Sequence, residues 1–209
     1  MKPLTRSSYE FEVRAASDDN GTHITGRPIV YNSRTNIGPF DEIIERGALD
    51  KTNLKDVRFL VNHDTSKIPL ARSRNNNANS TMQLSVDERG MVIRVNLDVE
   101  NNAEARSLYS AVQRGDISGM SFMFAIDDEE WEDLDKEHPT RHIRAISTVV
   151  EVSAVTFPAY EDTEINARSK EALDNARQTV ETARSKEQKS VDTDELELLK
   201  LKTKILGGM

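Results

Sequence analysis

Residues 119–126 read GMSFMFAI and decide the fold of this chain, because large and small side chains alternate along the segment. In an extended strand, successive side chains point to opposite faces of the sheet. Met120, Phe122 and Phe124 would share the core face, and Ser121 would lie among small residues on the other face. The pattern therefore predicts a β-strand that presents a serine away from the main core.

Other segments before residue 161 are also rich in β-branched and aromatic residues and are bounded by turn residues. With residues 119–126 they predict about seven strands, the others being Tyr9–Arg14, His23–Tyr31, Val57–Val61, Thr81–Val86, Met91–Val99 and Arg141–Phe157. A helix is predicted over Asn102–Arg114, with Asn101 or Asn102 as its N-cap and Gly115 as its C-cap. We expect a mainly β (α+β) fold, a small β-barrel core with covering helices.

The composition divides the chain near residue 168. All aromatic residues and prolines precede residue 161, whereas residues 168–209 hold nine basic and eight acidic residues. We therefore predict a domain over residues 1–167 and a charged C-terminal tail over residues 168–209. The tail has too little apolar surface to fold alone, so it is either disordered or a helix lying against a partner. Its apolar residues recur at Leu173, Ala176, Val180 and Ala183, then at Leu196, Leu199 and Leu201.

The overall composition excludes several classes of protein. The 209 residues include no cysteine, so disulfides, a thiolate nucleophile and cysteine-based zinc sites are ruled out, and serine or threonine must carry nucleophilic chemistry. A net charge of −8 argues against nucleic acid as the main partner and favours proteins or peptides. No apolar run is long enough to span a bilayer and no signal peptide is recognisable, so we expect a soluble, cytoplasmic protein.

Two polar segments interrupt the strand pattern. Residues 72–80, RSRNNNANS, show no periodicity and predict a mobile loop. Residues 127–138, DDEEWEDLDKEH, hold eight acids and one lysine and predict a solvated hairpin loop, the alternative being a functional acidic patch. The spacing lacks the glycine of a calcium loop, so we assign no metal.

His63 and Ser121 are the candidates for catalysis. His63 follows the apolar strand Val57–Val61, and an imidazole held at a strand end suits a general base. Ser121 has room around it for a substrate, with Ser118 as the fallback nucleophile. From the residues alone, a structural histidine and a serine tolerated on the outer face of a strand remain open alternatives.

A third group must orient the imidazole, and Glu151 is the best candidate. It interrupts the apolar strand Ile146–Val155, where an unpaired charge would be costly, and pairing with His63 would satisfy both residues. Asp64 is weaker, because neighbouring residues on a strand point to opposite faces. The residues alone indicate a soluble β-rich domain with a potential serine, histidine and glutamate centre.

Several segments, taken in order, resemble the prohead proteases of tailed bacteriophages, capsid maturation serine proteases distantly related to herpesvirus assemblins. They are Gly26–Asn32, Phe40–Leu49, Val61–Asp64, Gly119–Phe122 and Glu151–Tyr160. The resemblance covers about residues 8–167. It implies a β-barrel ringed by helices, with His63 and Ser121 matching the family histidine and serine and Glu151 matching the third catalytic member.

The resemblance also implies a biological setting. Such a protease lies inside the immature capsid, the prohead, in the host cytoplasm, and cleaves the scaffolding segment from the major capsid protein and also itself. It needs no cofactor, nucleic acid or membrane, and the setting allows a homo-oligomer. Met123 stands where many relatives carry glycine, which implies a narrower cleft and an altered substrate choice. Arg141 and Arg144 are weak candidates to bind the oxyanion.

Two rival functions remain. The first is a catalytically inactive capsid-assembly or scaffolding protein on the same fold. The second is a metal-dependent hydrolase that uses His63 and Asp64 with His138 or His142, although these residues lack ligand-like spacing.

Overall fold

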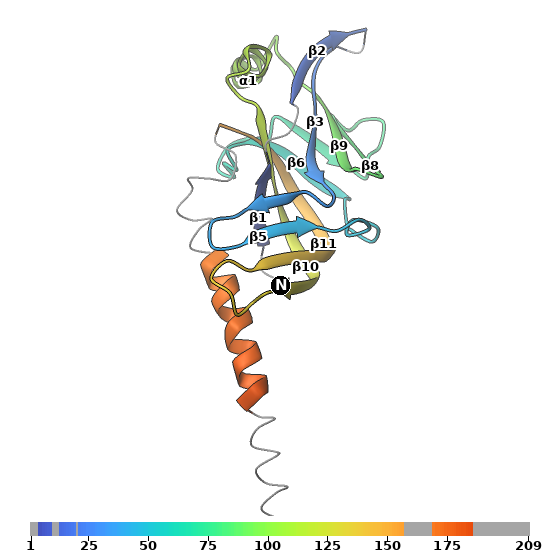
Figure 1. Ribbon diagram of the computed structural model, residues 1–209. Coiled ribbons are helices and arrows are strands. Elements are labelled where there is room, and N and C mark those ends of the chain that lie inside the picture. The colour runs from blue at the N-terminus through green and yellow to red at the C-terminus, as the bar shows by residue number, and fades with distance from the viewer. Residues whose placement is uncertain (1–3, 10–12, 20, 157–168, 186–209) are drawn as a thin grey trace, which may run out of the picture. The chain divides into compact units, whose positions relative to one another are not determined.

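The computed structural model describes residues 4–9, 13–19, 21–156 and 169–185. The chain divides into two units, Met1–Ser169 and Lys170–Met209. The described part of the first unit holds eleven strands and helix α1, and a second helix spans residues 169–185 (Figure 1). The prediction of a mainly β fold is confirmed.

The strands form two sheets. The larger has seven strands, in the order β1-β10-β11-β5-β4, with β6 pairing β11 and β7 pairing β6. Its strands are β1 (Leu4–Tyr9), β4 (Arg34–Asn36), β5 (Asp41–Ile44), β6 (Asp56–Val61), β7 (Ala71–Arg74), β10 (Gly119–Glu132) and β11 (Thr140–Val155). The smaller has the order β2-β3-β9-β8, formed by β2 (Arg14–Asp18), β3 (Gly21–Val30), β8 (Met82–Asp87) and β9 (Gly90–Asn96).

Both sheets contribute to one hydrophobic core. Ile24 and Ile93 from the smaller sheet belong to the same buried cluster as Phe59, Phe122 and Phe124 from the larger one. Burying large apolar side chains from both sheets is the main source of stability for such a domain. The sheets are open over the described residues, so the predicted closed barrel is not confirmed.

Helix α1 (Ala103–Arg114) forms where its capping residues predict it. The Asn102 side chain accepts hydrogen bonds from the N–H groups of Glu104 and Ala105, and Gly115 ends the helix in the left-handed conformation. Ala105, Leu108 and Val112 form its buried stripe. These residues recur at helical spacing and fix one face of α1 on the core.

Two predicted segments, Tyr9–Arg14 and residues 72–80, need comparison with the observed strands. Residues 10–12 of the predicted strand Tyr9–Arg14 lie outside the described residues; β1 ends at its first residue and β2 begins at its last. The predicted loop over residues 72–80 begins too early, because residues 72–74 belong to β7. In the turn that follows, the Asn76 side chain accepts from the N–H of Leu84 and donates to its carbonyl. Asn75 and Asn76 have positive φ values, a left-handed conformation that asparagine tolerates.

The prediction of a solvated loop over residues 127–138 is also wrong for its first half. Residues 127–132 continue β10 and pair with β11 up to Glu132 and Thr140. The carboxylates of Glu129 and Glu130 form ion pairs with Arg141 and Arg144 across the ribbon. Cross-strand partners explain why so acidic a segment forms a strand.

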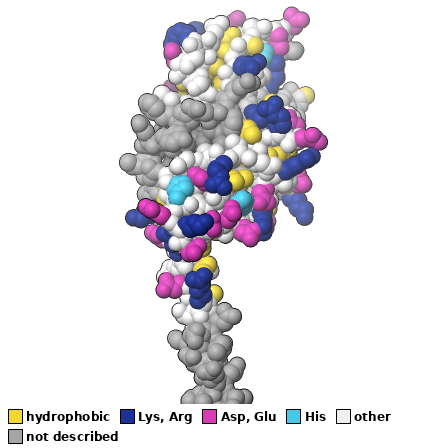
Figure 2. Space-filling model, viewed as in Figure 1, with side chains coloured by type: hydrophobic (Ala, Val, Ile, Leu, Met, Phe, Trp, Pro, Cys, Tyr) yellow, Lys and Arg dark blue, Asp and Glu magenta, His cyan; other side chains and the backbone are white. Residues whose placement is uncertain are grey.

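The C-terminal tail is helical over residues 169–185, while Leu196, Leu199 and Leu201 lie outside the described residues. Neither helix in the described part is long and apolar enough to cross a membrane. On the face shown in Figure 2, acidic and basic side chains are interspersed over the described part of the domain.

Candidate active site

Sheet topology brings the three candidate residues to one place. Strand β11 lies between β6 and β10 in the larger sheet. Because β6 runs parallel to β11, its last residue, Val61, pairs with Ala154 near the end of β11. On the other side, Ser121 of β10 lies directly opposite Ser153 of β11. The end of β6 and the beginning of β10 therefore flank the stretch of β11 that contains Glu151.

A tight turn after β6 aims the histidine. Asn62 and His63 both have positive φ values, 51° and 57°. The Asn62 N–H donates to the Ala154 carbonyl at 2.9 Å, and its side chain exchanges two hydrogen bonds with Thr156. Two consecutive left-handed residues are unfavourable outside glycine, so these contacts to β11 hold the turn in place.

Ser121, His63 and Glu151 form one hydrogen-bonded line. Ser121 Oγ lies 2.6 Å from His63 Nε2, and His63 Nδ1 makes a short hydrogen bond with Glu151 Oε1. An ionised carboxylate only accepts, so Nδ1 carries the hydrogen that it donates to Glu151. In a neutral imidazole, Nε2 is then the acceptor for the serine hydroxyl proton.

Ser153 is a fourth member of this network, and sequence reasoning did not single it out. Its hydroxyl donates to Glu151 Oε2 at 2.6 Å and accepts from the His63 backbone N–H at 3.1 Å. Ser153 thus ties the carboxylate to the turn that carries the imidazole. Its position two residues after Glu151, on the same face of β11, was the available signal.

The network is almost entirely buried. The exposed fractions are 0% for Ser121, 3% for Glu151 and 8% for His63. The alternative that Ser121 is merely tolerated on an outer strand face is therefore wrong, because residues 119–125 are all buried and the Ser121 hydroxyl contacts the His63 ring. Burial strengthens hydrogen bonds within the line. It also means that a substrate must displace neighbouring atoms to reach the hydroxyl.

The other candidates of the sequence analysis have different partners. The Arg141 guanidinium donates to Glu129 at 2.8 Å, and Arg144 pairs with Glu130, so neither arginine is committed to an oxyanion at Ser121. His138 contacts Asp41, and His142 contacts Glu45 and Glu132. Over the described ranges, no group of three or more metal-ligating side chains gathers around His63 and Asp64.

Asp64 follows His63 but takes no part in the line. Its carboxylate accepts from the hydroxyl and the N–H of Ser66, and these hydrogen bonds hold the pKa of Asp64 below its usual range. Asp64 therefore stays ionised at the surface next to the buried histidine, and Glu151 is the carboxylate that contacts the imidazole.

A serine hydroxyl, an imidazole and a carboxylate in line are the parts needed for nucleophilic attack on a carbonyl. The model of the caudovirus prohead serine protease family matches residues 9–178 of the chain. The chain belongs to this family. The match covers most of the domain, including all four residues of the buried network, and family membership supports a serine protease associated with phage proheads.

The comparisons also found individual proteins that are similar to this chain. The prohead protease of Enterobacteria phage HK97 is 26% identical over 166 residues, a region that covers 78% of this chain and 67% of that protein. A solved structure of the capsid assembly protease of bacteriophage T4 matches with a TM-score of 0.48 and 12% identity, covering 74% of this chain and 98% of that one.

Proposed function

We propose that this protein is a serine endopeptidase of phage capsid maturation, with Ser121 as nucleophile, His63 as general base and Glu151 as the group that orients the imidazole. The observation that carries the proposal is the buried line from Ser121 Oγ through His63 to Glu151. The three residues come from separate segments of the chain. Apolar side chains would fill this buried region equally well, so the alignment of a hydroxyl, an imidazole and a carboxylate there indicates a functional site.

The proposed mechanism is a series of proton transfers, and the hydrogen bonds of the line support their order. His63 Nε2 takes the proton of Ser121 as Oγ bonds to the peptide carbonyl carbon, and Glu151 stabilises the imidazolium that forms. His63 then gives this proton to the departing amide nitrogen as the C–N bond breaks, which leaves an ester on Ser121. A water molecule, deprotonated by His63, hydrolyses that ester and restores the serine hydroxyl.

The proposal extends to the substrates. We propose that the protease cleaves the major capsid protein, at its scaffolding segment, and also itself, inside the prohead in the host cell. The family and the relative from phage HK97 carry the description of prohead proteases, which supports this assignment. The charged tail, residues 168–209, is proposed to co-assemble with capsid or scaffold helices and to be a site of self-processing.

The decisive experiment compares Ser121→Ala with Ser118→Ala in the full chain. Each variant is co-expressed with the capsid protein of the same phage, and cleavage is followed by mass spectrometry. Ser121→Ala should lower the cleavage rate by about 10⁴-fold or more, because it removes the attacking atom. Ser118→Ala removes an exposed hydroxyl three residues away and should leave cleavage unchanged.

The outcomes separate the readings. Cleavage by Ser121→Ala at the wild-type rate would contradict the nucleophile assignment. Absence of cleavage by the wild type, with normal incorporation into proheads, would support the catalytically inactive assembly protein instead. For the tail, a chain lacking residues 168–209 should be excluded from proheads, and unchanged incorporation would refute its targeting role.

A further inference from the structure

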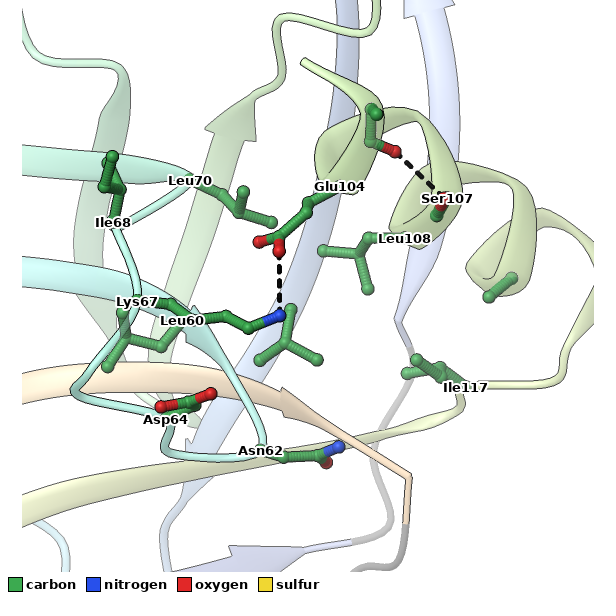
Figure 3. A pocket seen from close by; sticks show the side chains of 13 residues that line it. Leu60, Asn62, Asp64, Lys67, Ile68, Leu70, Glu104, Ser107, Leu108 and Ile117 are labelled. Atoms are coloured by element: carbon green, nitrogen blue, oxygen red, sulfur yellow. Dashed lines mark hydrogen bonds and ion pairs between the residues drawn. The ribbon is translucent and has the colours of Figure 1, made fainter.

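An apolar pocket lies beside the turn that carries His63. It has a volume of about 460 Å³ and opens between that turn, the segment through Leu70, and helix α1. Figure 3 shows Asn62 and Asp64 on one side, Leu108 on the helix opposite, and Ile117 on the segment that leads into β10. The volume is within the range of small-molecule and side-chain binding pockets.

The pocket is close to the reacting atoms along two independent paths. Asn62 and Asp64, which line it, are the chain neighbours of His63. Ile117, which also lines it, lies four positions before Ser121, and an extended strand advances about 3.3 Å per residue, so the two are at most roughly 13 Å apart. A substrate strand passing Ser121 advances by the same amount per residue. The pocket therefore lies within reach of a side chain no more than about four residues from the scissile bond.

The pocket walls select the chemical class of that side chain. Leu60, Leu70, Leu108 and Ile117 provide branched apolar surface, and Ala103 and Ala111 leave the space open along α1. Ile68, at the rim, is 86% exposed, so its side chain would gain apolar burial from an occupant of the pocket. An aliphatic side chain would bury these surfaces, whereas a charged one would lose its hydration.

An ion pair links the two sides of this pocket. Lys67 from the loop donates to Glu104 of α1 at 2.7 Å, and Figure 3 shows the two side chains meeting across the opening. Both are about half exposed, so the pair contributes little stability. It connects the loop after His63 to the helix at the edge of the pocket.

We propose that this pocket binds an aliphatic side chain of the polypeptide substrate, Leu, Ile, Val or Met, within four residues of the cleaved bond. The inference rests on the proposed function and specifies its substrate class. Continuity with the catalytic turn is what identifies the occupant as substrate rather than a second copy of the chain. Occupancy of the pocket places the peptide beside Ser121 and so contributes to both binding and orientation.

The test uses the full-length protein and a library of peptides derived from bacterial proteins, with the new termini identified by mass spectrometry. Cuts that depend on Ser121 should share an aliphatic residue at one position within four residues of the bond. Ala111→Leu fills the pocket and should lower the cleavage of these peptides by about tenfold or more, while peptides with Gly or Ala there change little.

Two further variants make the result interpretable. Ser107→Leu narrows the same pocket from an exposed helix position, so it tests the effect without disturbing the core. Gln113→Leu adds the same side chain at an exposed position of α1 outside the pocket and should leave the cleavage profile unchanged. Labelling of Ser121 by a fluorophosphonate should be equal in all three variants.

The results distinguish two kinds of failure. Ser121-dependent cuts with no aliphatic position, or a profile that Ala111→Leu and Ser107→Leu leave unchanged, overturn the pocket assignment while the protease function stands. No Ser121-dependent cuts at all overturn both. If Ala111→Leu and Ser107→Leu change the mass of the protein in sedimentation but leave its cleavage profile unchanged, the pocket binds a second copy of the chain. That result also overturns the assignment.

Discussion

Two buried carboxylates, one within the long β10–β11 ribbon and one on the neighbouring strand β5, contact different partners. Glu151, 3% exposed, contacts the imidazole of His63. Glu42 of β5, 0% exposed, lies opposite Arg141 in the sheet register, with 3.7 Å between the carboxylate and the guanidinium. Both sites bury charge, but an imidazole exchanges a proton near neutral pH, whereas a guanidinium remains charged.

The groups around the two pairs also differ: aromatic rings surround Arg141, whereas a hydroxyl contacts His63. The Arg141 guanidinium carbon lies 5.9 Å from the centre of the Phe40 ring and 5.5 Å from that of Trp131, and these two rings contact each other edge to face. That arrangement packs and neutralises a permanent cation. The His63 ring instead contacts a hydroxyl, Ser121, on its other nitrogen. Burial of a charged pair therefore does not by itself indicate a catalytic site, and the role proposed for His63 rests on the Ser121 hydroxyl at its other nitrogen.

Of the two pairs, the one proposed to be catalytic should show the largest effect, a loss of kcat in Glu151→Gln. An amide at this position can donate to His63 Nδ1 and so favours the wrong tautomer for accepting the Ser121 proton. The expected loss in kcat is about 10³- to 10⁴-fold, with the thermal unfolding midpoint nearly unchanged. Capsid cleavage rates and circular dichroism measure the two quantities, and full activity in this variant would remove Glu151 from the mechanism.

Arg141→Met should remove the second pair, Arg141 with Glu42, and lower stability rather than activity. It leaves the carboxylates of Glu42 and Glu129 without their cation, so the free energy of unfolding should fall by about 3–5 kcal/mol. Activity per folded molecule should stay within about threefold of wild type, because Arg141 does not contact the His63 line. Urea denaturation with an activity assay checks both.

A second variant controls for the loss of packing around Arg141. Arg141→Met combined with Glu42→Gln and Glu129→Gln removes the stranded charges and should recover most of the stability. If the triple variant is as unstable as Arg141→Met alone, lost contacts with Phe40 and Trp131, rather than unpaired charge, cause the effect.

The contrast also shows which parts of the molecule could be predicted from sequence. Glu151 could be found because a charge in an apolar strand needs a partner, and α1 could be found because Asn102 and Gly115 cap it. The strand over residues 127–132 could not, because Arg141 and Arg144, which neutralise it, are distant in sequence. Composition detects local excess of charge but not the partner that cancels it.

Short strands and small polar residues were missed for a related reason. β5 has only four residues and exists because it pairs with β4 and β11. Ser153 was not recognised, since a serine on a buried strand has no periodicity that separates a hydrogen-bonding role from a tolerated one. Both depend on tertiary neighbours, which the sequence of one segment does not contain.

Ser153→Ala should have a smaller effect on the hydrogen-bonded line of Ser121, His63 and Glu151. The Ser153 hydroxyl contacts both Glu151 Oε2 and the His63 backbone N–H, so its removal loosens the carboxylate and the imidazole from their positions in the line. We expect kcat to fall by about tenfold, roughly 1.4 kcal/mol, while KM changes little. Ser153→Thr keeps the hydroxyl and should restore kcat. A loss of stability with an unchanged kcat would indicate a merely structural role.

The smallest expected effect concerns an exposed carboxylate, Asp87, which accepts two hydrogen bonds from Arg27 at 2.6 and 2.7 Å. These bonds lower the pKa of Asp87, so its contribution to stability is present above the ordinary carboxyl pKa and is lost as pH falls through the lowered value. Asp87→Asn should therefore slightly lower the thermal unfolding midpoint at pH 7, and the difference from wild type should shrink between pH 4 and pH 2 and in 1 M NaCl. Cleavage activity should not change. If the difference in unfolding midpoint between wild type and Asp87→Asn is equal at pH 7 and pH 2, the charge of Asp87 is not its source. The exposed pair would then stabilise the protein through packing.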